Sequence, residues 1–213
     1  MSKPMKVWIY ACQFEEDPAY QGSVLSLPAH QEAVKDAFPR ARLKDGEPYL
    51  LDRGGYWPGF IESVLERCNH TLGELNLLAY KLSQMTERQI EIYEGVLKVL
   101  PERNMKQVIN GLYNLERFEF LPGIRCDSDI GEMTIENDLD PLLKELPGDI
   151  YPLLDTEKVG AYVRETENGV FTSRGYCYRV SDQWQEVYDG KQLPEQVSRR
   201  PSGLRKTMTR PNS

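Results

Sequence analysis

Two helix-start signals in the middle of the chain constrain its fold more than any other feature. Thr71-x-x-Glu74 and Thr86-x-x-Gln89 are both capping boxes, in which the threonine and the side chain three residues later each satisfy a backbone N–H of the first turn. Apolar residues follow each box at the spacing of one helix face. A third apolar stripe follows Asn104, and short connections make the three helices antiparallel neighbours. The sequence therefore predicts a helical domain over residues 71–121.

Residues 1–70 are predicted to form an α+β domain. Segments rich in aromatic and β-branched residues favour strands, and apolar residues at helical spacing favour helices. The predicted strands are 6–14 and 47–55, and the predicted helices are 26–38 and 60–68. Ser26 is the expected cap of the first of these helices, and Pro28 suits its first turn.

Residues 122–189 are predicted to form a second α+β domain. The expected elements are helices over 139–146 and 156–169, and a hairpin over 169–180 that turns near Gly175. On the second helix, Val159, Tyr162 and Val163 are expected to face inward. The fold class predicted for the whole chain is therefore α+β, with three small domains in series.

The last segment, residues 190–213, differs in composition from the rest of the chain. It contains three prolines, one acid, few large apolar residues and six bases, namely Lys191, Arg199, Arg200, Arg205, Lys206 and Arg210. A segment of this composition buries too little apolar surface to fold alone. The sequence therefore predicts a disordered basic tail.

Acidic residues are concentrated in one part of the chain. The stretch DSDIGEMTIENDLDPLLKELPGD, residues 127–149, holds eight carboxylates and one lysine. Residues 127–167 as a whole have twelve acids and three bases, a net charge of −9, whereas residues 1–126 have a net charge of −2 and residues 168–213 of +4. The acidic segment therefore needs an explanation of its own.

No pattern of residues indicates catalysis or a bound cofactor. The two histidines lack a second metal ligand at helical spacing, the four cysteines stand alone, and the sequence contains neither a GxSxG elbow nor a phosphate-binding glycine loop. The acidic stretch departs from the EF-hand pattern at Gly131, Met133 and Asp138. We therefore expect no enzyme activity, no cofactor and no metal. The lack of a signal peptide and of a membrane-spanning run predicts a cytoplasmic protein.

Two interpretations of the acidic segment remain. One is a solvated acidic face, which is the usual role of a charge run. The other is a surface that competes with DNA for a basic cleft. If residues 132–140 are helical, Glu132, Glu136 and Asp140 lie on one face with ~5–6 Å between neighbours. Like charges at this spacing repel, and a cationic partner relieves that repulsion.

Three blocks of the sequence resemble the ArdA antirestriction family. They are ELNLLAYKLSQMTERQIEIYEGVL, VINGLYNLERFEFLPGI and LLDTEKVGAYVRETENGVFTSRGY, in this order and spacing. The most specific parts are IN-x-L-Y-N-L…F-x-F-L-P-G and YVRETENGVFTSRGYCY. The resemblance covers roughly residues 5–183 and is strongest over residues 72–178.

The resemblance implies a non-enzymatic inhibitor that imitates DNA. ArdA proteins are elongated homodimers built of three small domains, and they mimic bent B-form DNA. They fill the DNA-binding channel of type I restriction-modification enzymes, at the methyltransferase and specificity core, without a cofactor, a membrane or direct binding to nucleic acid. The residues expected to imitate phosphates are Asp127, Asp129, Glu132, Glu136, Asp138, Asp140, Glu145, Asp149, Asp155, Glu157, Glu165 and Glu167.

Three further acids, on the second central helix, are expected to contribute to the same surface. Helical spacing pairs Glu87 with Glu91 and Glu91 with Glu94. The same spacing directs them away from the apolar stripe that contains Tyr93 and Leu97. We therefore expect these three carboxylates to be exposed.

Two alternatives follow from features that depart from the family pattern. The nearly balanced charge of residues 1–126 leaves open another defence nuclease, such as a CRISPR effector, as the target. The basic tail leaves open a nucleic-acid-binding accessory protein. The two classes differ in one observable property, because an accessory protein binds DNA directly and a mimic does not.

Overall fold

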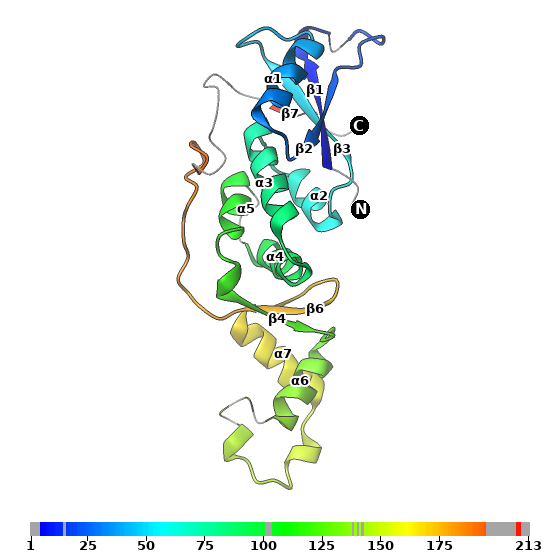
Figure 1. Cartoon of the computed structure of the whole chain (residues 1–213). Coiled ribbons are helices and arrows are strands. Elements are labelled where there is room, and N and C mark those ends of the chain that lie inside the picture. The colour runs from blue at the N-terminus through cyan, green and yellow to red at the C-terminus, as the bar shows by residue number, and fades with distance from the viewer. Residues whose placement is uncertain are drawn as a thin grey trace. The chain divides into compact units, whose positions relative to one another are not determined.

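A computed structural model describes most of the chain and divides it into two compact units. The described residues are 5–14, 16–100, 104–137, 139, 141, 143–194 and 208–209. Unit 1 comprises Met1–Met85, Glu102–Asn110 and Glu186–Ser213, and unit 2 comprises Thr86–Pro101 and Gly111–Gln185. Helices and sheets are mixed along the chain, so the predicted α+β class is confirmed (Figure 1). The finer division into domains 1–70, 71–121 and 122–189 stays a prediction.

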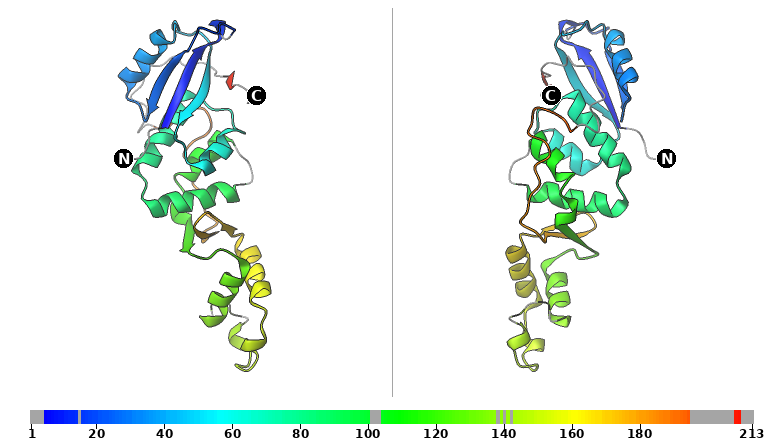
Figure 2. Two further views of the ribbon diagram at one scale, coloured as in Figure 1. Left: turned by 90° about the vertical axis from the view of Figure 1, so that its right-hand side faces the viewer. Right: turned by 60° about the vertical axis from the view of Figure 1, so that its left-hand side comes forward.

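Unit 1 is built on a sheet with the strand order β2-β1-β3-β7. The central strand β1 (Met5–Ala11) pairs antiparallel with β2 (Ser23–Leu27) and β3 (Tyr49–Gly55), as Figure 2 shows. Every second residue of β1, starting at Val7, is fully buried. Helix α1 (Gln31–Arg40) packs against β2. This alternation places the core on one face of the sheet.

Three further helices of unit 1 begin within one residue of their predicted starts. Helix α2 spans Gly59–Leu65 and α3 spans Leu72–Gln84. Helix α5 (Met105–Gly111) belongs to unit 1 up to Asn110. The capping box of α3 is confirmed, because the backbone N–H of Glu74 donates to Thr71 Oγ1 (3.2 Å) and the N–H of Thr71 donates to Glu74 Oε2 (2.7 Å). Its stripe from Leu72 to Leu82 is buried.

Parts of the predicted disordered tail have defined structure. The backbone N–H groups of Lys191 and Gln192 both donate to Asp189 Oδ1. The short strand β7 (Met208–Thr209) pairs parallel with β3. The prediction of disorder is wrong for these residues, whereas residues 195–207 and 210–213 lie outside the described residues.

Unit 2 combines helices and short 3₁₀ turns with a second sheet. The strand order is β4-β6-β5, with β4 at Phe118–Pro122, β5 at Val170–Phe171 and β6 at Gly175–Arg179. Helix α4 (Glu87–Val99) has its predicted capping box and packs on all three strands. Helices α6 (Asp127–Glu136) and α7 (Thr156–Glu167) pack on each other. Short 3₁₀ turns span Cys12–Phe14 in unit 1 and Leu115–Arg117, Leu143–Glu145 and Tyr151–Leu153 in unit 2.

Glycines bring α6 and α7 into direct backbone contact. A Cβ on Gly131 would overlap the carbonyl oxygen of Thr156, the first residue of α7. A Cβ on Gly160 would overlap the carbonyl oxygen of Asp127, the first residue of α6. Since neither obstacle is a flexible side chain, only glycine fits at both positions.

Several predicted elements differ from the observed ones. The helix expected over 26–38 is wrong at its start, because Ser26 belongs to β2 and α1 begins at Gln31. In the described part of 139–146, only the turn Leu143–Glu145 is helical, and it is 3₁₀. The prediction that Tyr162 faces inward is also wrong, since its side chain is 51% exposed. The hairpin is confirmed by the antiparallel pairing of β5 and β6.

The glycine contact predicts a steric cost for alanine in α7. Gly160→Ala should lower the free energy of unfolding by about 1–3 kcal/mol, despite a gain in helix propensity of about 1 kcal/mol. Denaturant titration followed by circular dichroism measures the change. Gly148→Ala is the matched control, because a Cβ there meets no atom within 4 Å. Equal stabilities of the two variants would contradict the close packing.

Candidate functional site

The acidic segment begins with a helix that displays part of its charge. Helix α6 spans Asp127–Glu136, so Glu132 and Glu136 lie one turn apart on one face, and both are exposed. Asp129 has a structural role, because the backbone N–H groups of Arg125 (2.6 Å) and Cys126 (3.2 Å) donate to its Oδ2. The bond from Arg125, together with those from Cys126, lowers the pKa of Asp129.

Asp127 is tied to the neighbouring helix. Arg164 of α7 donates from Nε to Asp127 Oδ1 (2.7 Å) and from a second guanidinium nitrogen to Oδ2 (3.1 Å). This bidentate geometry is the strongest that an arginine–carboxylate pair makes. The same guanidinium lies 5.9 Å from the centroid of the Phe171 ring. Asp127 is therefore neutralised inside the unit, unlike an exposed phosphate.

Asp155 also has a partner within its own helix. It is the N-cap of α7 and accepts from the backbone N–H of Lys158 (3.2 Å). The Lys158 ammonium lies 3.1 Å from its other oxygen, although both side chains are largely exposed. The hydrogen bonds and charge of Lys158 lower the pKa of Asp155. Such an exposed pair contributes little to stability.

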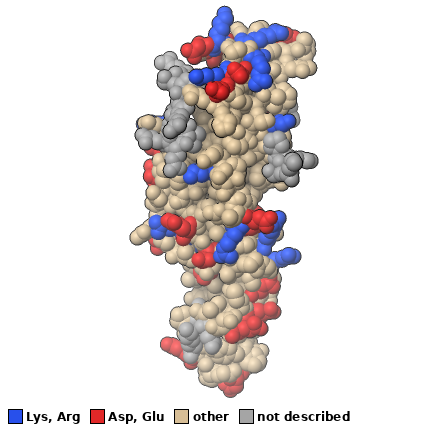
Figure 3. Space-filling view, in the orientation of Figure 1, with Lys and Arg blue, Asp and Glu red and all other residues tan. Residues whose placement is uncertain are grey.

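Six predicted acids remain exposed and unpaired, and we call them the six exposed acids: Glu132, Glu136, Glu145, Asp149, Glu157 and Glu165. None of the six forms an ion pair with any residue that the structure describes. Figure 3 shows acidic side chains, and no basic ones, on the visible face around α6 and residues 143–153. Asp138 and Asp140 lie outside the described residues.

Glu167 supports the hairpin that follows α7. Its carboxylate accepts a hydrogen bond from the hydroxyl of Tyr176 (2.9 Å), whose ring is 1% exposed. Burial raises the pKa of Glu167, and the bond from Tyr176 partly opposes this effect. Glu167 is half-buried, so it contributes little to the exposed charge.

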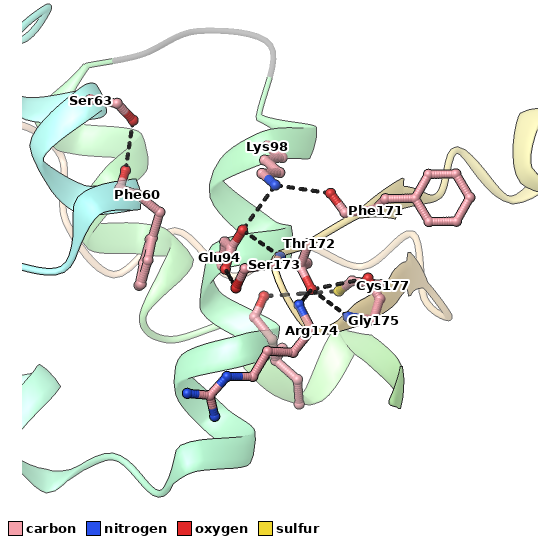
Figure 4. Close-up of polar contacts among 11 residues, drawn as sticks. Phe60, Ser63, Glu94, Lys98, Phe171, Thr172, Ser173, Arg174, Gly175 and Cys177 are labelled. Atoms are coloured by element: carbon pink, nitrogen blue, oxygen red, sulfur yellow. Dashed lines mark hydrogen bonds and ion pairs between the residues drawn. The ribbon is translucent and has the colours of Figure 1, made fainter. Parts of the chain in front are cut away.

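The expected exposure of the α4 acids is wrong for two of the three. Glu91 and Glu94 are 8% and 6% exposed, and only Glu87 is exposed. Glu94 holds the hairpin turn, as Figure 4 shows: Ser173 donates its N–H to Oε1 (3.0 Å) and its hydroxyl to Oε2 (2.8 Å). Lys98 lies 2.9 Å from Oε1. Burial by itself raises the pKa of Glu94, but the bonds from Lys98 and Ser173 outweigh it and lower that pKa.

The carboxylate of Glu91 has fewer hydrogen-bond and ion-pair partners than that of Glu94. Arg174 Nε lies 3.2 Å from Glu91 Oε1, while Oε2 is buried without a hydrogen-bond partner in the described part of the chain. Burial raises the pKa of Glu91, and the charge of Arg174 opposes this. Gly95 explains why the helical spacing wrongly predicted that Glu91 and Glu94 are exposed. The Cys177 side chain fills the space of a Cβ at Gly95, so the sheet covers the side of α4 that the apolar stripe does not.

The described residues give no sign of a metal centre. No group of three or more histidine, cysteine, aspartate or glutamate residues among them is placed to hold an ion. The four cysteines, all within the described ranges, form no disulfide, and Cys68 and Cys177 are buried whereas Cys126 is exposed. No helix within the described ranges is long and apolar enough to cross a bilayer.

Comparison with known proteins identifies no family. No protein-family model matches the sequence, and no curated protein matches it. The resemblance to ArdA proteins therefore stays a prediction from the sequence blocks. The exposed carboxylates of unit 2, and the elements that hold them, are the structural features that bear on function.

The environment of Glu94 predicts a pH-dependent contribution to stability. Glu94→Gln should lower the free energy of unfolding by about 1–3 kcal/mol at neutral pH, because bonds to a buried charge are lost. Since its pKa is depressed in the folded state, this contribution is present above the unfolded value and is lost as the pH falls through the folded value. The difference from wild type should shrink below about pH 4. Denaturant titrations at several pH values measure it.

Glu87→Gln is the matched control on the same helix. Glu87 is exposed in the first turn, so its neutralisation should change stability by no more than about 0.5 kcal/mol. A loss at Glu87 as large as the loss at Glu94 would contradict the assignment of Glu94 as the anchor of the turn.

Proposed function

We propose that the acidic surface of unit 2 imitates DNA and occupies the DNA-binding channel of a type I restriction-modification enzyme. The observation that carries the proposal is the set of six exposed acids, none of which is paired with a described residue. In this proposal the protein is a cytoplasmic homodimer that is not an enzyme, uses no cofactor and does not bind nucleic acid itself. The resemblance of three sequence blocks to the ArdA family supports the choice of target.

The physical basis is the exchange of one polyanion for another. Duplex DNA carries one charge per ~1.7 Å of axis, and a protein channel that binds it is lined with lysine and arginine. Carboxylates displayed on a rigid protein surface meet the same cations. Acids one helical turn apart, such as Glu132 and Glu136, lie ~5–6 Å from each other. Binding to a basic channel removes the repulsion between them.

The packing of unit 2 also supports the proposal. Helices α6 and α7 are joined by backbone contacts at Gly131 and Gly160 and by the Asp127–Arg164 pair. The exposed acids on these helices are therefore displayed in a fixed arrangement. A rigid surface loses less conformational entropy on binding than a flexible acidic segment does.

A competition assay with a multiply neutralised variant tests the proposal. The sextuple variant replaces the five glutamates of the six exposed acids by Gln and Asp149 by Asn. It should displace labelled duplex DNA from a type I restriction-modification enzyme at least about tenfold less well than wild type, because one exposed ion pair contributes about 0.2–1 kcal/mol. Displacement by the wild-type protein should fade as salt rises. Single neutralisations should have small effects.

The matched control removes the same number of charges from unit 1. In this control, six other acids, all exposed and all in unit 1, are replaced by the corresponding amides: Glu32, Asp36, Asp45, Asp52, Glu62 and Glu66. If both sextuple variants lose displacement equally, total charge and not the surface of unit 2 is responsible. If wild type leaves the type I enzyme unaffected but displaces DNA from another defence nuclease, the target is wrong. Direct binding of the protein to DNA would contradict the mimic and favour an accessory protein.

A further inference from the structure

The segment of unit 1 that follows the hairpin is bound by side chains of two helices of the same unit. We call residues 186–193 the strap. The strap forms neither a helix nor a strand. Its partners lie on α3 and α5 and come from residues far away in the sequence. Its attachment therefore resembles the recognition of a peptide rather than the continuation of a sheet.

Asn110 of α5 forms hydrogen bonds with the backbone of the strap. Its Oδ1 accepts from the backbone N–H groups of Val187 and Tyr188, both at 2.8 Å, and its Nδ2 donates to the carbonyl of Tyr188 at 2.8 Å. The Asn110 side chain is 2% exposed, so these bonds replace water in a buried place. A carboxamide supplies both a donor and an acceptor, which suits it to bind a peptide unit.

Tyr188 gives the strap its side-chain specificity. Its side chain is 3% exposed, and its hydroxyl donates to Glu74 Oε1 at 2.9 Å. The other oxygen of Glu74 is already held by the capping box of α3 through the N–H and hydroxyl of Thr71. The carboxylate is therefore positioned before the tyrosine arrives, and it selects a phenol over a benzyl group.

Contacts on both sides of Tyr188 complete the recognition. The Lys106 ammonium lies 2.9 Å from a carboxylate oxygen of Glu186. Further along, Leu193 packs against α3 at Gly73, where a Cβ would lie 2.9 Å from Leu193 Cδ1. An acidic residue two positions before tyrosine and an apolar residue five positions after it thus have partners in unit 1.

These contacts follow the general form of peptide recognition, in which main-chain hydrogen bonds supply affinity and a pocket supplies specificity. We propose that α3 and α5 of unit 1 form a peptide-binding site for a segment with the pattern Glu-Val-Tyr. The strap fills this site in the same chain, and the strap of a second copy of the protein fills it in exchange. The proposal concerns unit 1 alone, so it does not depend on the acidic surface of unit 2.

A labelled peptide with the sequence of residues 184–194 tests the site. The full-length chain carrying Tyr188→Ala, whose own strap is weakened, should bind the peptide saturably in fluorescence anisotropy. The wild-type chain, whose site is filled, should bind it at least about tenfold more weakly. A peptide with Phe in place of Tyr188 should bind the Tyr188→Ala chain about tenfold more weakly, because it lacks the bond to a carboxylate.

Two full-length variants together identify the source of the exchanged strap. Tyr188→Ala keeps the site but weakens the strap, and Asn110→Ala keeps the strap but weakens the site. A mixture of the two, labelled with different fluorophores, should show energy transfer above that of either variant mixed with itself. Peptide binding without this gain would overturn the second copy as the occupant.

If a variant does not fold, hydrogen exchange of the wild-type protein still tests the proposal. The amides of Val187 and Tyr188 should exchange through local opening, with at least about tenfold less protection than the core amides of β1. Exchange of these amides only with global unfolding would overturn the proposal, because the strap would then be a permanent part of the core. A folded Tyr188→Ala chain that does not bind the peptide would overturn it as well.

Discussion

The backbone contact between α6 and α7 determines how unit 2 presents its charge. Helices of 10 and 12 residues are marginal by themselves in water, so their stability comes from packing. Glycines at 131 and 160 allow each helix to lie against the first carbonyl of the other, and Arg164 binds Asp127 across the same interface. The four exposed acids on these helices, Glu132, Glu136, Glu157 and Glu165, are thereby attached to a rigid helix pair. Without that contact, the same residues would form a flexible acidic segment.

The carboxylates of unit 2 divide into two groups according to their partners. Asp127, Asp129 and Glu94 accept charge-assisted or backbone hydrogen bonds and stabilise local structure. Glu132 and Glu136 face solvent without an ion-pair partner in the described chain. In the first group, hydrogen bonds lower the pKa of Asp129 and of Glu94. Neutralising a member of this group disturbs the fold, whereas neutralising an exposed acid changes only the surface.

Local signals in the sequence predicted local structure well. The boxes at Thr71 and Thr86 mark the starts of α3 and α4, because capping depends on residues within one turn. The hairpin of β5 and β6 followed from its turn residues, and the exposure of the six exposed acids followed from their charge. Strands β2 and β4 were both missed, since their pairing depends on residues distant in sequence.

Two errors came from treating a helix or a tail by itself. The apolar stripe of α4 predicted one buried side, but the absence of a side chain at Gly95 lets Cys177 approach from the other side and buries Glu91 and Glu94. The strap had no periodicity to detect, because Asn110 and Glu74 supply its partners. The asparagine lies within the block IN-x-L-Y-N-L, where a buried polar residue in an apolar stripe was the available signal.

A solvated acidic face and a partner-binding surface differ in what they do with nearby cations. A surface that only needs to be hydrated gains from neutralising close carboxylates wherever a base is at hand. In residues 127–167, two of the three bases, Arg164 and Lys158, are engaged by Asp127 and Asp155. Their positive charge stabilises the contact between the two helices and the start of α7, and the six exposed acids have no ion-pair partner among the described residues. An arrangement that uses its cations for structure leaves its exposed acids to a cationic partner, which is the condition that a mimic of DNA requires.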